Sequence, residues 1–266
     1  MAAFPLPVAG ERLAGLATRA YRRSLLVWAF RLPLAAPFVL MGPELVAAGT
    51  GRPGAVSNLS ASTADVLGTS TFLIFTAMLA VTPIHTVTGW RWHLVLRRDY
   101  GVAMFATAAT DLTLAATTTG DTFPGGFLTR VAGHTFLAVG TLSVLLLIPL
   151  ALTATLPARR WLGRHWKWLH RLTYVVWITV LFHLLLLFGP RRFFLDAVAV
   201  SIPLGVLRIP RLQRWWARSR RRRARRLPRW LLGAALATLF AVGYIPFVHE
   251  LARVGSAAFA QSPPRD

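Results

Sequence analysis

Apolar residues gather along this chain into long continuous runs, which are separated by short segments rich in arginine. A helix needs about 17–25 mainly apolar residues to cross a bilayer. Seven runs reach or approach that length, and they predict membrane helices near residues 24–42, 66–84, 102–118, 131–156, 172–188, 193–207 and 230–247. We therefore expect an all-α polytopic membrane helical bundle, with six core transmembrane helices and a seventh near the C-terminus.

Composition supports a membrane protein and excludes several kinds of site. Of the 266 residues, 55% are hydrophobic, above the roughly 45–50% of soluble domains. The chain contains no cysteine. Disulfides, cysteine-ligated iron–sulfur clusters and thioether attachment of haem are thereby excluded.

Lysine and arginine are distributed unequally between alternate loops, which predicts the orientation of the chain. Of 30 such residues, 23 lie before the first run or after the second, fourth and sixth, six lie in the alternate segments, and Arg31 lies within the first run. Cytoplasmic loops carry the positive excess, so we expect a cytoplasmic N-terminus and a C-terminus across the membrane, which is the periplasmic side if the protein lies in a bacterial inner membrane. The expected divisions are a cytoplasmic segment 1–23, the bundle 24–207, an arginine-rich cytoplasmic segment 208–229, an extra transmembrane helix 230–250 and a periplasmic tail 251–266.

The segment 208–229 contains the run RSRRRRARR. Basic segments beside a membrane helix bind anionic lipid, and we take anionic lipid as its expected partner. Nucleic acid is not an expected partner, because no recognition motif or aromatic platform accompanies the arginines.

Two histidines in the fifth run are the first candidates for chemistry. His170 and His183 are thirteen residues apart, which places them about 20 Å apart along a helix. Ionisable groups inside a membrane are costly, and this makes them functional candidates. Each also has a simpler explanation: His183 as a neutral histidine hydrogen-bonded between helices, and His170 as an interfacial residue among tryptophans.

Four segments in the middle of the chain carry a family resemblance: TFLIFTAMLAVTPI at 71–84, LRRDYG at 96–101, LALTAT at 150–155, and WLGRHWKWLHRLTYV at 161–175 followed by His183. Residues 66–210 resemble the ferric-reductase-like transmembrane family, and most closely its MsrQ (YedZ) type, the haem-binding membrane subunit of a periplasmic methionine-sulfoxide reductase system. The resemblance implies haem b and electron transfer from a cytoplasmic flavin reductase or quinol to a periplasmic oxidoreductase. FMN or a quinone could then be a further cofactor.

The resemblance also assigns residues. In that family, haem is held by histidines on the third and fifth helices, and His170 and His183 match the fifth-helix pair. The third-helix histidine falls thirteen residues after Arg98, where this chain has Asp111. His134, which opens the fourth run beside Gly133, is a candidate replacement or an interfacial histidine. Arg97 could neutralise haem propionates or anchor the chain to lipid.

Asp111 leaves two functions open. A buried carboxylate is expected to be protonated, paired or hydrated, and Asp111 could hydrogen-bond a ligating imidazole. It is also a poor substitute for imidazole on low-spin haem. The alternative to electron transfer is therefore a non-haem membrane protein that kept the fold for a structural or partner-anchoring role.

Overall fold

The computed structural model describes residues 24–51 apart from 26, residues 64–117 and residues 124–223. The expected seventh run and the two terminal segments lie outside these ranges. All regular structure within them is helical, with no strand. The longer helices are α2 Ala36–Gly49, α4 Thr69–Thr88, α5 Leu96–Thr117, α6 Gly125–Gly133, α7 Thr135–Leu152, α10 Leu172–Phe188, α11 Arg192–Val206 and α12 Pro210–Arg223. Two short helices, α8 Leu156–Leu162 and α9 Arg164–Leu169, connect α7 to α10.

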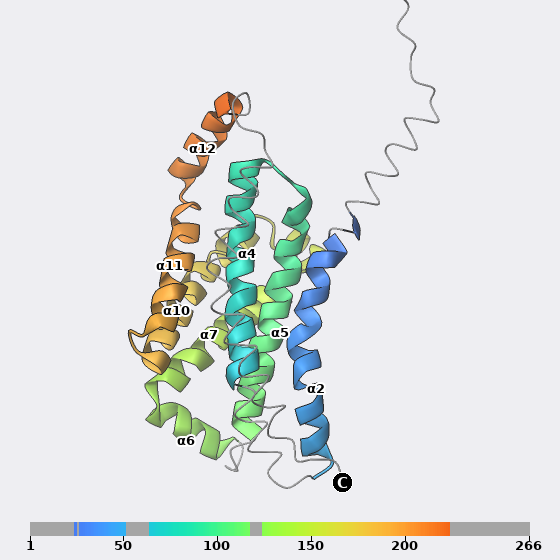
Figure 1. Cartoon of the computed structure of the whole chain (residues 1–266), viewed down its shortest axis with the longest axis vertical. Helices are drawn as coiled ribbons and strands as arrows, with labels where there is room; N and C mark the ends of the chain where they lie inside the picture. Colours follow the sequence, from blue (N-terminus) through green and yellow to red (C-terminus); the bar gives the residue numbers. More distant parts are fainter. Residues whose placement is uncertain (1–23, 26, 52–63, 118–123, 224–266) are drawn as a thin grey trace, which may run out of the picture.

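Helix α4 lies in the middle of the bundle, with α5 and α2 on one side and α11 and α12 on the other (Figure 1). The most apolar stretch of the span Val66–Thr88 is 61% buried inside the bundle. The corresponding stretches are 11% buried in Thr135–Leu152 and 17% buried in Arg164–Phe188. The outer helices thus turn most of their apolar surface outward. This is the distribution expected where lipid, rather than water, surrounds the bundle.

Four helices of the described residues are long and apolar enough to cross a membrane: Val27–Ala47, Val66–Thr88, Thr135–Leu152 and Arg164–Phe188. A shorter apolar helix covers Phe194–Val206. Helix α5 has 22 residues, which is about 33 Å of helix, and it packs against α4 and α7. The all-α membrane bundle is confirmed, whereas the count of six core helices plus one stays a prediction.

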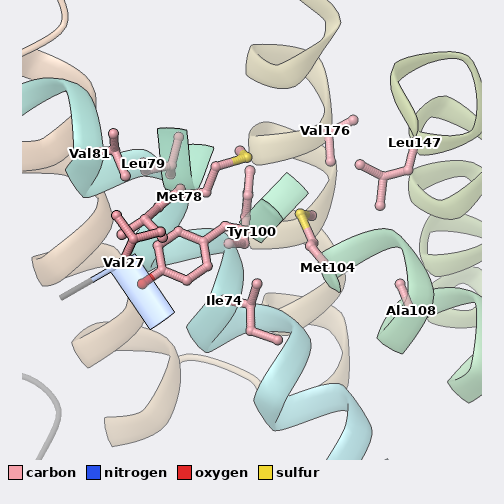
Figure 2. Packing of buried hydrophobic residues seen from close by; sticks show 12 residues of the cluster. Val27, Ile74, Met78, Leu79, Val81, Tyr100, Met104, Ala108, Leu147 and Val176 are labelled. Carbon is pink, nitrogen blue, oxygen red and sulfur yellow. The ribbon is translucent and has the colours of Figure 1, made fainter. Parts of the chain in front are cut away.

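The core of the bundle forms where α4, α5, α7 and α10 meet (Figure 2). Phe75 and Leu79 of α4, Met104 of α5 and Val176 of α10 are each at most 1% exposed. Small hydroxyl residues join the same helices, because Thr71 donates to Thr107 and Ser143 donates to Thr179, each at 2.8 Å. Such bonds satisfy polar side chains where water is absent.

Two of the expected runs differ in the structure. The first continues to Gly49 through a 3₁₀ turn at Leu32–Ala35, and Arg31 within it donates to Asp99 at 2.8 Å. The ion pair with a residue of the LRRDYG segment explains how an arginine is tolerated in this run. The fourth run, expected as one helix over 131–156, divides at His134, whose extended backbone (φ −126°, ψ 106°) separates α6 from α7.

Candidate functional site

A cavity of about 290 Å³ lies between α4, α5, α7 and the α8–α10 segment. Its polar side chains are mostly cationic, with Arg97 and Arg98 from the first turn of α5, Arg159 from α8, and His170 just before α10. Its walls are apolar and include two of the four methionines of the chain, Met78 and Met104. We call this space the basic cavity. Its combination of cations and apolar walls suits an anionic ligand with a large apolar body.

His170 is held in this cavity by a stack of side chains. The guanidinium of Arg159 lies 5.1 Å from the ring centre of Trp166, and the Trp166 and His170 rings are 4.1 Å apart. The indole N–H of Trp166 donates to the carbonyl of Thr153 at 3.0 Å. His170 Nε2 lies 3.3 Å from the Thr153 hydroxyl. Gly163, with φ +51°, allows the chain to turn between α8 and α9. Trp166 and His170 are one helical turn apart, because the His170 N–H donates to the Trp166 carbonyl.

His183 lies on α10 toward the opposite end from His170 and has a defined tautomer. Its Nδ1 is 2.7 Å from the carbonyl oxygen of Phe136 on α7. A carbonyl only accepts, so Nδ1 carries the proton and Nε2 is left as the nitrogen able to ligate a metal. Gly140 makes room for this ring, because a Cβ at that position would be 2.9 Å from His183 Cε1.

His134 lies near His183, with Phe136 between them. The ring centres of His134 and Phe136 are 5.8 Å apart, and those of Phe136 and His183 are 6.3 Å apart. His134 itself is exposed at the break between α6 and α7. Gly133, next to His134 in the sequence, could have let another helix or a porphyrin approach closely, but it has open space around it. The glycine that allows a close approach is Gly140, against which the His183 ring packs.

Asp111 lies on α5 against the backbone of Gly68, where a Cβ would be 4.0 Å from Asp111 Oδ2. Among the residues that the structure describes, no hydrogen bond or ion pair joins Asp111 to His183 or His134. Asp111 also does not line the basic cavity. The structure thus brings Arg97 and His170 together, and His134 and His183 together, while Asp111 has different neighbours.

Two further histidines have structural roles at the end of α4. His93 is 5% exposed, and its Nε2 lies 3.1 Å from the carbonyl oxygen of Val81. Burial lowers the pKa of His93 from its usual value, which favours the neutral ring. His85 Nδ1 contacts the carbonyl of Trp90. Within the described ranges, no group of three His, Cys, Asp or Glu side chains could hold a metal ion, so any bound iron would need a ligand of its own, as porphyrin provides.

Three features of the basic cavity were not expected from the sequence: the Arg159–Trp166 stack and the Met78 and Met104 walls. Trp166 was expected as one of the interfacial tryptophans around His170, and no role was predicted for either methionine. The spacing of Arg159 and Trp166 could not have suggested their contact, because a turn at Gly163 separates α8 from α9. Nothing in the sequence could have placed both methionines opposite one histidine.

The fold and these sites define a multi-pass, all-α membrane protein with histidines placed near both ends of one membrane-length helix, Arg164–Phe188. Comparison with curated proteins gives 34% identity over 117 residues to the haem-binding subunit MsrQ of protein-methionine-sulfoxide reductase from Ralstonia nicotianae, covering 44% of this chain and 54% of the relative. The MsrQ proteins of Herminiimonas arsenicoxydans and Azospira oryzae are 31% and 34% identical, over 54% and 52% of this chain and 65% and 59% of their own lengths.

The MsrQ-like resemblance inferred from the sequence is therefore confirmed, over a region that spans between about half and two thirds of the curated relatives it matches. No family model matches the chain, and no solved structure matches it.

Proposed function

We propose that this protein carries electrons across the bacterial inner membrane through haem b, as the membrane subunit of an oxidoreductase system. The observation that carries the proposal is the state of His183, whose Nδ1–H donates to the Phe136 carbonyl and whose Nε2 is left for iron. The MsrQ relatives, which are named as haem-binding subunits of a methionine-sulfoxide reductase, support the same chemistry.

The residues around the basic cavity are of the chemical types that bind haem. His170 offers an imidazole, Met78 and Met104 offer thioethers, and both are established axial ligand types. Arg97, Arg98 and Arg159 could pair with propionates, which the planar guanidinium recognises well. The volume of about 290 Å³ is near the lower limit of about 300 Å³ for ligand pockets, so the lining side chains would have to move apart when haem binds.

Haem supplies the redox step when bound, and the protein binds it, excludes water and sets its electrostatic surroundings. The arginine-rich end would face the cytoplasm, where a flavin reductase or quinol would deliver electrons, with FMN or a quinone as a further redox group. The His134–His183 end would face the periplasm, and its partner would be an oxidoreductase such as a methionine-sulfoxide reductase. His134 would be the replacement for the absent third-helix ligand.

The alternative is a non-haem membrane protein with a structural or partner-anchoring role. Asp111 favours it, because Asp111 replaces the expected histidine and lies against Gly68 rather than beside His183. The two functions differ in one simple property of the purified protein, since only the first gives a haem absorption spectrum.

Reduced-minus-oxidised spectra and pyridine-haem quantitation of the detergent-purified protein test the proposal. We expect His183→Ala to abolish most of the reduced Soret and alpha-band signal, and His134→Ala to change a low-spin spectrum to high-spin. His165→Ala is the matched control, because His165 is exposed and outside the cavity. A full haem complement in His183→Ala would refute its assignment, and a colourless wild type would favour the alternative.

We also propose that α12 binds anionic phospholipid headgroups. Arg211, Arg214 and Arg218 follow one another on a single side of this helix and surround a shallow hollow at Ala217. No described carboxylate forms an ion pair with them. Arg214 Nε donates to the Pro210 carbonyl at 3.2 Å, and Arg218 Nε donates to the Arg214 carbonyl at 3.4 Å. Their other N–H groups are left for phosphate.

A further inference from the structure

The arginine nearest the bundle, Arg208, is not exposed like those of α12 but buried, with 6% of its surface accessible. It lies in the short connection between α11 and α12 and reaches the middle of α4. Its Nε donates to the carbonyl of Leu79 at 3.2 Å, and one terminal nitrogen donates to Leu79 at 3.0 Å and to Met78 at 3.2 Å. A guanidinium has several N–H groups in a fixed plane, so it can serve two neighbouring carbonyls at once.

Of these two carbonyls, that of Leu79 needs a donor because of a proline one turn further along α4. Pro83 lies inside the helix, where it has no N–H for the carbonyl four residues earlier, and its ring pushes that carbonyl aside. The residue four before Pro83 is Leu79. In a membrane, a carbonyl without a partner is costly, because no water replaces the missing bond. Arg208 therefore supplies the donor that Pro83 removes.

The same contact reaches the basic cavity. Met78 accepts from Arg208 through its backbone, and its side chain lines the cavity. On the cavity side, Met78 Sδ would lie 3.5 Å from a Cβ at Gly101, another lining residue. Figure 2 shows Met78 and Leu79 side by side on α4, among the buried residues that face α5 and α10. A shift of α4 at Met78 would thus move a wall of the cavity.

We propose that Arg208 is a positioning residue: it pairs the Leu79 carbonyl freed by Pro83, ties the middle of α4 to the α11–α12 connection, and so holds the Met78 wall of the basic cavity in place for the cofactor. The effect of Arg208 on cofactor binding rests on the proposed haem function. The pairing of Arg208 with the carbonyl that Pro83 frees does not depend on that function. The two parts can be tested separately in one set of variants.

The first measurement is the thermal unfolding midpoint of the detergent-purified protein. Arg208→Met removes the donors and keeps an unbranched side chain, and we expect its Tm to fall by about 3–8 °C because buried carbonyls lose their partner. Pro83→Ala restores an N–H to the helix, so Arg208→Met should cost less than half as much in that background. Arg164→Met, an exposed arginine outside the basic cavity, is the control and should leave Tm unchanged.

The second measurement is haemin affinity, followed by absorption in the wild type, in Arg208→Met, in Pro83→Ala and in the double variant. We expect Arg208→Met to weaken haemin binding at least fivefold and to raise the high-spin fraction, and the double variant to recover most of both. Equal Tm losses with proline and alanine at position 83, or no loss at all, would overturn the pairing of Arg208 with Pro83. Unchanged haemin binding and spin state in Arg208→Met would overturn its positioning role. A wild type that binds no haemin would instead refute the proposed function, while the Tm comparison would still decide the pairing.

Discussion

At the scale of single residues, the contact between His183 and Gly140 leaves no room for a side chain at position 140. The histidine ring fills the space that any larger residue at position 140 would need, since a Cβ there would be 2.9 Å from Cε1 and 3.0 Å from Nδ1. The ring is held from the other side by its bond to Phe136. A single methyl group can therefore disturb His183 without changing the histidine itself.

We predict that Gly140→Ala lowers the haem content of the purified protein by at least half. The added methyl must displace the imidazole and break its bond to the Phe136 carbonyl, so Nε2 loses its fixed direction. Pyridine-haem quantitation measures the effect. Gly133→Ala is the control, because nothing lies within 4 Å of its new Cβ. Equal haem content in the two variants would argue against His183 as a ligand.

At the scale of elements, α12 shows how one helix can be both packed and basic. Its side toward α4 carries the half-buried Leu212 and Trp216, whereas Arg211, Arg214 and Arg218 are exposed. Charge dominates the sequence there, so the sequence predicted a juxtamembrane anchor and not a helix packed along α4. The packed side fixes which arginines point outward.

We predict that replacing Arg211, Arg214 and Arg218 together by Gln weakens binding to anionic lipid. Each arginine near an anionic surface contributes about 1 kcal/mol, so retention of phosphatidylglycerol over phosphatidylcholine should fall at least tenfold. Native mass spectrometry of protein released from mixed nanodiscs measures this. Arg160→Gln with Arg164→Gln, both exposed, is the control. Loss of phosphatidylglycerol on adding inorganic phosphate alone would show that the site takes free phosphate rather than a lipid.

For two other helices, the sequence alone predicted the bounds almost correctly. The run expected at 172–188 coincides with α10, and that expected at 193–207 differs from α11 by one residue at each end, because continuous apolar runs end where charged or glycine residues begin. The break at His134 was not predicted, since no proline marks it and the apolar pattern continues across it. Likewise, α6 is a separate short helix whose existence depends on packing against α7.

At the scale of the whole molecule, sequence supplied the candidate residues of the site but not their arrangement. His170 and Arg97 were both candidates, yet only the packing of α5 and α10 on α7 brings them to one cavity. The role of Arg208 was hidden for a different reason: its partners are backbone carbonyls of α4, which no side-chain pattern reveals. Asp111 was identified as a departure from the family, but its neighbour Gly68 is a tertiary contact.

The last prediction concerns the orientation of the entire chain. The arginines of the basic cavity and of α12 come from segments assigned to one side of the membrane by the unequal distribution of charge, with 23 of 30 basic residues on that side. Helices α4 and α5 are joined by a short connection at Gly89–Val95, so Arg97 and Arg98 lie at the same end of the bundle as the C-terminal end of α4.

We therefore expect reporter fusions after Arg226 to be active in the cytoplasm, and fusions after Asp266 to be active in the periplasm. A fusion after Thr50, beyond α2, should report the periplasm and serves as the internal control for the first span. Activity on the same side after Arg226 and after Asp266 would mean that the run 230–247 does not cross the membrane and that the bundle has no seventh span. Reversal of all three reporters would place the basic cavity on the periplasmic side, where a cytoplasmic donor could not reach it.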